Sequence, residues 1–143
     1  MSNSSTKPTV IFWVISVIAL LWNIMGVIAY LSQAYITDEA LALLPEAEQA
    51  WYNNVPAWVT AAFAIAVFAG TLGSIALLLR KKWAVTLFIM SLVGVVVQSI
   101  YSFFIQNYVE ITGEKAIMPT VVILIALFLV WYSNKLSKHR ILI

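Results

Sequence analysis

The stretch Leu77-Leu-Leu-Arg-Lys-Lys-Trp-Ala84 decides the fold of this chain. Its three consecutive cations, Arg80 to Lys82, separate two long apolar runs. A charge at the centre of a bilayer costs at least about 2.5 kcal/mol, so these residues must lie in water or among lipid headgroups. The two apolar runs therefore enter a membrane from the same side and form a helical hairpin. Short loops rich in lysine and arginine stay in the cytoplasm, so we name residues 80–82 the cytoplasmic clip.

The composition extends this interpretation to the whole chain. Of 143 residues, 63% are hydrophobic and only 10% are charged, whereas soluble domains carry about 25% charged residues. A membrane span needs about 20 consecutive apolar residues, and the chain holds four such runs. The sequence therefore predicts an all-α fold, an integral membrane antiparallel four-helix bundle formed as a single domain by residues 1–143. The expected spans are residues 10–31, 57–79, 83–105 and 117–133, with outer loops at 32–56 and 106–116 and the clip at 80–82.

Positive and negative charges are segregated along the chain. Seven of the eight lysines and arginines lie in the N-terminal segment, the clip or the C-terminal tail, and all six acids lie in the two other loops. The positive-inside rule then predicts that both termini are cytoplasmic. The tail, which also carries His139, is expected to act only as a topology signal. The seven cations are Lys7, Arg80, Lys81, Lys82, Lys135, Lys138 and Arg140, and the acids are Asp38, Glu39, Glu46, Glu48, Glu110 and Glu114.

The residues needed for catalysis are missing from the predicted spans. They contain no acid and no histidine, and the chain has no cysteine. No nucleophile can be paired with a base, and no metal-binding spacing occurs, so we expect no enzyme activity, no catalytic residues, no cofactor and no metal. The four-helix small multidrug exporters match the chain in size but depend on a glutamate in their first helix. Asn23 is the only candidate here, so proton-coupled export is not expected.

Small and polar residues recur at helical spacing in the first three spans. Ser16, Ala19, Asn23, Gly26 and Tyr30 share one face of the first span. Such stripes let membrane helices pack closely. Packing within the monomer, with the second span against the third, and packing in a homodimer both fit this pattern. The residues expected to mediate helix packing are Gly26, Ala62, Ala66, Gly70, Gly73, Ser74, Ser91 and Gly94.

Two amides identify a candidate polar pocket. At 1.5 Å per residue, Asn23 and Gln98 both lie roughly 20 Å from the inner surface, in the outer half of the bilayer. Tyr30, Tyr101 and Ser102 lie slightly above them. If the first and third spans touch, the five side chains can line a pocket for a neutral polar solute. The alternative is that the amides hydrogen-bond to each other and only hold the helices together.

The remaining segments suggest contacts at the membrane surface. Thr37, Asp38 and Glu39 read as the capped start of a short helix, and Pro45 begins a second one. Both are expected to lie on the outer surface. The fourth span has no polar residue from Val121 to Val130, so it is expected to face lipid or another subunit. Residues 1–8 are expected to be disordered, and residues 108–112 to be briefly extended.

Four segments resemble a known group of proteins. They are 22–26 (Trp-Asn-Ile-Met-Gly), 55–58 (Val-Pro-Ala-Trp), 70–74 (Gly-Thr-Leu-Gly-Ser) and 77–84. Together they resemble a family of uncharacterised small bacterial four-helix membrane proteins, DoxX-like in size, whose members are often labelled "sugar transporter". The resemblance spans nearly the whole chain and implies the four-helix topology and a location in the bacterial inner membrane.

Two functions fit these observations. The first is a non-enzymatic module that binds a lipid or a partner protein through the long outer loop and the fourth span. The alternative is a passive transporter of a small, neutral, sugar-like solute that uses the Asn/Gln/Tyr pocket as an oligomer. The expected partners are membrane lipids and either further copies of the chain or another membrane protein. A nucleic-acid partner is not expected, because basic tails beside a membrane usually meet anionic lipid.

Overall fold

The computed structural model describes residues 7–110 and 113–143, and it confirms an all-helical fold. Four helical segments are long and apolar enough to cross a membrane, as expected for a multi-pass membrane protein. Within the described residues, no strand is formed. The elements are α1 (Val10–Ala34), α2 (Asp38–Ala42), α3 (Glu46–Asn54), α4 (Ala57–Leu78), α5 (Ala84–Ile100), the π-helix η1 (Tyr101–Ile105), the 3-10 helix η2 (Gly113–Ala116) and α6 (Ile117–Lys138).

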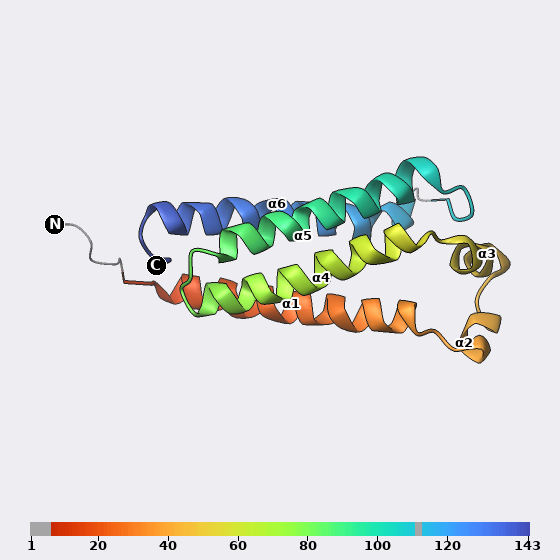
Figure 1. Cartoon of the computed structure of the whole chain (residues 1–143), viewed down its shortest axis with the longest axis horizontal. Coiled ribbons are helices and arrows are strands. Elements are labelled where there is room, and N and C mark those ends of the chain that lie inside the picture. Colours follow the sequence, from red (N-terminus) through yellow and green to blue (C-terminus); the bar gives the residue numbers. More distant parts are fainter. Residues whose placement is uncertain (1–6, 111–112) are drawn as a thin grey trace.

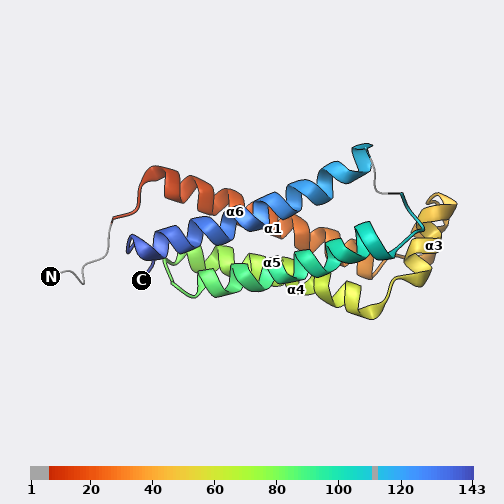
Figure 2. The ribbon, with the colours of Figure 1, turned by 90° about the horizontal axis from the view of Figure 1, so that it is seen from above.

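The four long helices run side by side in alternating directions (Figure 1). α1 packs along α4, α4 along α5, and α5 along α6. α1 and α6 do not pack along each other, and Figure 2 shows that they cross and then separate toward α3. We call the end that holds Arg80 and the C-terminus the basic end, and the end that holds α2 and α3 the acidic end. No close helix contact therefore joins α1 to α6 along this side of the bundle.

The backbones of α4 and α5 approach each other closely. A Cβ atom added to Gly94 would lie 2.6 Å from the backbone oxygen of Ala62 and 2.8 Å from the backbone nitrogen of Ala66. Ser91 Oγ, one turn away, donates a 2.6 Å hydrogen bond to the Ala66 carbonyl. The small residues of both helices thus pack backbone against backbone within one chain, as membrane helices do in the absence of a hydrophobic driving force.

The small-residue stripe of α1 faces α4, not α5. Ser16, Ala19 and Asn23 are buried, and a Cβ added to Gly26 would lie 3.0 Å from a methyl carbon of Val67. Further along, the Tyr30 ring packs edge-on against two phenylalanine rings of α4. The opposite face of α1 is apolar and exposed, as expected of a surface in contact with lipid.

Both helices that end at the basic end terminate in a left-handed residue. Arg80 has φ 59° and Arg140 has φ 61°, the conformation that usually selects glycine. The next amide in each case reaches back into the last turn, from Lys81 to the Ala76 carbonyl and from Ile141 to the Leu136 carbonyl. These Schellman-type caps turn the chain sharply at residue 80 and at residue 140.

The C-terminal residues dock against the clip. The Ile143 amide donates a 2.7 Å hydrogen bond to the Arg80 carbonyl, and Arg80 Nε donates a 2.9 Å hydrogen bond to the Ile141 carbonyl. Leu142 is fully buried in the apolar core of the basic end, with Phe12, Leu77 and others. α6 also extends to Lys138, past the predicted end at residue 133. The expectation that the tail acts only as a topology signal is therefore wrong, because its last residues pack into the core.

Replacing Leu142 with alanine should destabilise the protein by about 2 kcal/mol, the low end of the range for a buried leucine, because the site is close to a chain terminus. Ile143 is exposed, so Ile143→Ala is the matched control and should change little. Thermal unfolding in detergent measures both. Equal stability of the two variants would show that the docked tail contributes nothing to the core.

The connection between α1 and α4 forms the acidic end. Thr37 Oγ1 accepts a 3.1 Å hydrogen bond from the Ala40 amide and so caps α2, and α3 begins directly after Pro45. Gln49 Nε2 donates a hydrogen bond to the Leu44 carbonyl, which ties α3 to the preceding turn.

The predicted extended segment at residues 108–112 lies partly outside the described residues, and its described part, 108–110, is irregular. Most of the N-terminal segment predicted to be disordered also lies outside them.

Candidate functional site

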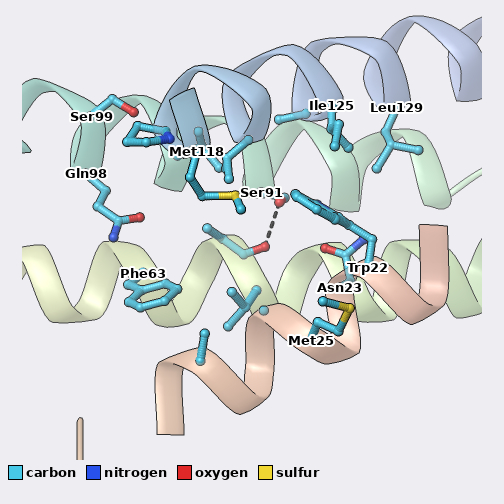
Figure 3. A pocket seen from close by; sticks show the side chains of 18 of the residues that line it. Trp22, Asn23, Met25, Phe63, Ser91, Gln98, Ser99, Met118, Ile125 and Leu129 are labelled. Carbon is cyan, nitrogen blue, oxygen red and sulfur yellow. Dashed lines mark hydrogen bonds between the residues drawn. The ribbon is translucent and has the colours of Figure 1, made fainter. Parts of the chain in front are cut away.

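A cavity of about 390 Å³ lies inside the bundle, bounded by α1, α4, α5 with η1, and α6 (Figure 3). Its size is near the lower end of the range of about 300–1,000 Å³ that is usual for small-molecule sites. The lining is mainly apolar and includes Trp22, Phe63, Met118 and Val122. Five polar residues contribute to it: Asn23, Ser91, Gln98, Ser99 and Ser102.

Asn23 holds α1 against α4 at one side of the cavity. Its Nδ2 donates a 2.8 Å hydrogen bond to the Ala19 carbonyl and a 3.2 Å hydrogen bond to Ser74 Oγ. Ser74 Oγ in turn donates to the Gly70 carbonyl at 2.9 Å. Asn23 Oδ1 lies directly over Gly70, where any side chain would displace it. Glycine at position 70 is therefore what lets the amide reach α4.

Gln98 lies across the cavity from Asn23. Its half-buried side chain projects from α5 into the cavity (Figure 3). Within residues 7–110 and 113–143, its amide forms no hydrogen bond, and it does not contact the amide of Asn23. The predicted direct pairing of the two amides is therefore not observed; a cavity separates them. Gln98 remains available to donate to, and accept from, a bound molecule.

The other predicted pocket residues divide between two environments. Ser102 lines the cavity, whereas Tyr30 and Tyr101 do not. Tyr30 packs on α4 with its ring centroid 5.5 Å from that of Phe63, and Tyr101 is buried with its ring 5.8 Å from Trp58. Both tyrosines therefore stabilise helix packing at the acidic end.

Several lining residues were not predicted. Trp22 directly precedes Asn23, and Ser99 directly follows Gln98. Including the sequence neighbours of the two amides in the prediction would have found both. The contribution of α6, which includes Met118 and Val122, has no polar signal in the sequence. An apolar run reads as a lipid-facing surface, although the same side chains can form the wall of a cavity.

The chemistry available in the cavity is neutral. Among the described residues that line it, none is acidic or basic. In the described part of the chain, no group of three or more histidine, cysteine or acidic residues is placed to hold a metal. The cavity can therefore recognise a molecule through apolar contact and through hydrogen bonds from an amide and hydroxyl groups.

The two amides should respond differently to substitution. Asn23→Leu removes the bond to Ser74 and places a branched side chain against Gly70, so it should lower stability by about 1–2 kcal/mol. Gln98→Leu removes no hydrogen bond and should leave thermal unfolding in detergent nearly unchanged. Equal losses of stability in both variants would contradict the separate roles assigned here.

No protein-family model, curated protein or solved structure matches this chain. The resemblance to small bacterial four-helix membrane proteins consequently remains a prediction from the sequence.

Proposed function

We propose that this protein is a non-enzymatic membrane protein that binds a small amphiphilic molecule between its helices. The observation that supports this most strongly is the cavity of about 390 Å³ between Asn23 and Gln98. A pair of amides that served only to join helices would leave no such space. Apolar walls with a few convergent polar groups are typical of small-molecule sites.

The character of the lining favours an amphiphile over a sugar. A sugar presents many hydroxyl groups, and each one buried without a partner would cost free energy. In the described part of the chain, only the amide of Gln98 and a few hydroxyl groups are available in the lining to meet them. A molecule with an apolar body and one or two polar groups matches the lining better. Such a molecule would enter from lipid where α1 and α6 separate.

Passive transport is the alternative, and the basic end argues against it. There, the helices are joined by fully buried side chains that include Phe12, Leu77 and Phe88. A single chain would need to open this core to release a solute on the far side. Transport would therefore require an oligomer or a large rearrangement, whereas binding requires neither.

We place the protein in the bacterial inner membrane with the basic end and both termini in the cytoplasm. The support is the lysines and arginines of the clip and of the last turn of α6. α2 and α3 then lie at the outer surface. The exposed apolar face of α6, which includes Leu124 and Leu127, remains available to lipid, to another copy or to a partner protein.

Fluorescence quenching tests the binding proposal. The chain has six tryptophans, and Trp22 lines the cavity. A variant that keeps Trp22 alone, with phenylalanine at the other five positions, is placed in phosphatidylcholine nanodiscs and titrated with bromododecanol. A molecule that enters the cavity should quench Trp22 along a saturating curve.

The matched control keeps Trp131 as the only tryptophan. Its side chain is 57% exposed on the outside of α6, so bromododecanol dissolved in the bilayer should quench it without saturation. If Trp22 shows the same non-saturating curve as Trp131, the cavity does not bind the molecule and the proposal fails.

A further inference from the structure

A second cavity, of about 240 Å³, lies at the acidic end beneath α3. We call it the vestibule. Its walls come from α3 and the turn before it, and from the segment that follows α5. The residues that line it are Leu44, Glu48, Trp51, Tyr52, Ser102, Gln106 and Val109.

Ser102 belongs to the walls of both cavities. It lies in the π-helix η1, and such wide turns often occur at functional sites. The side-chain amide of Gln106 stabilises this turn. Its Nε2 donates hydrogen bonds to the Ser102 carbonyl at 2.9 Å and to the Val109 carbonyl at 2.6 Å. Its Oε1 accepts hydrogen bonds from the backbone amides of Tyr108 and Val109. With these four hydrogen bonds, the Gln106 amide has no donor left to bind a ligand. Ser102 is thus the point where the vestibule adjoins the bundle cavity.

The vestibule has the chemistry of a cation site. Among the residues that the structure describes, Glu48 is the only charged one in this lining, and it is half-buried. The Trp51 and Tyr52 rings lie beside it, 5.2 Å apart and edge to face. Burial, and then the nearby Glu48 carboxylate, raises the pKa of the Tyr52 phenol above its usual value. A carboxylate next to aromatic rings is suited to an ammonium group.

The surrounding charges favour the same ligand. Lys115 is the only lysine or arginine in the two loops of the acidic end, and it is exposed on η2. All six acids of the chain lie in these loops. A cation is therefore attracted to this end, and an anion is repelled.

We propose that the vestibule binds the ammonium head of a single-chain amphiphile whose apolar chain occupies the bundle cavity, with Ser102 at the junction. This inference rests on the proposed function and adds the class of ligand. The two cavities together are small, so a ligand with one chain fits them better than a two-chain phospholipid. Glu48 would pair with the ammonium group, and Trp51 and Tyr52 would contact its faces.

Competition tests the proposal in a protein that keeps Trp22 and Trp51, with phenylalanine at the other four tryptophan positions, because Trp51 belongs to the vestibule. Dodecylamine and dodecanol have the same chain, and the amine is protonated at neutral pH. Each is used to displace bromododecanol in phosphatidylcholine nanodiscs. Dodecylamine should displace it at a concentration about tenfold lower than dodecanol does, and Glu48→Gln should remove this preference. Glu46→Gln, an exposed change on the same helix, is the control and should retain it.

The results separate the two proposals. If dodecanol binds normally but dodecylamine has no advantage, or if its advantage survives in Glu48→Gln, the ammonium site is wrong and the bundle cavity stands. If neither compound displaces bromododecanol and Trp22 quenching does not saturate, the cavity proposal fails and the vestibule proposal fails with it. Dodecanol binding serves as the folding control, because unchanged binding in the Glu48→Gln variant shows that this variant is folded.

Discussion

Replacing Gly94 with leucine should prevent α4 and α5 from packing and should destabilise the protein by more than about 3 kcal/mol. Even the first added carbon would lie 2.6 Å from the Ala62 oxygen and 2.8 Å from the Ala66 nitrogen. Both atoms belong to the backbone of α4, so no side chain can rotate away to make room. The helices would have to separate, with loss of the Ser91 hydrogen bond to the Ala66 carbonyl.

Thermal unfolding in detergent measures this loss. Val93→Leu is the matched control, because Val93 is the neighbouring residue and is exposed on the outside of α5. Its unfolding temperature should change little. A Gly94→Leu protein as stable as Val93→Leu would show that α4 and α5 do not pack as closely as described.

Filling the bundle cavity should abolish ligand binding. Ala29 lines the cavity from α1 and is not packed into the core, so a phenylalanine there has room to enter the space without displacing α4. We expect Ala29→Phe to weaken saturable quenching of Trp22 by bromododecanol at least about tenfold. Thermal stability should stay near that of the parent, because the new ring replaces empty space.

Ile28→Phe is the control for this change. Ile28 is 59% exposed and does not line the cavity, so a phenylalanine there remains on the outer face of α1. Binding in this variant should match the parent protein. Equal binding in Ala29→Phe and Ile28→Phe would mean that bromododecanol quenches Trp22 from outside the bundle.

The four apolar helices and the hairpin at residues 80–82 were predictable because each rests on a strong local signal. Charged residues are costly inside a bilayer, and apolar runs of about 20 residues are typical of membrane-spanning helices. The cap at Thr37 and the helix start after Pro45 follow from local chemistry as well. Local features of this kind can be predicted without knowing which helices pack against each other.

The choice of helix partners was not predictable in the same way. Spacing showed that Asn23 lies on a small-residue face, but it did not show whether that face meets α4 or α5. The structure pairs Asn23 with Ser74 of α4, because Gly70 leaves space for the amide. With α1 placed on α4, Gln98 of α5 has no hydrogen-bond partner among residues 7–110 and 113–143, and a cavity remains.

The sequence also contained no pattern that predicts the docked tail or the contribution of α6 to the cavity wall. A left-handed helix end is usually predicted from glycine, whereas arginine occupies both such positions here, at 80 and 140. Leu142 therefore read as part of a basic tail, not as a core residue. The apolar face of α6 was expected to meet lipid or another subunit, because nothing in its composition distinguishes the wall of a cavity from either kind of surface.

The central claim is that the space between Asn23 and Gln98 holds a small amphiphile. Anomalous diffraction from crystals grown in a lipid mesophase with bromododecanol tests it most directly. We predict a bromine peak within the cavity bounded by Trp22, Gln98 and Val122, with the two amides apart. A closed cavity with the Asn23 and Gln98 amides hydrogen-bonded to each other, and bromine only on the outer faces of the helices, would contradict the account.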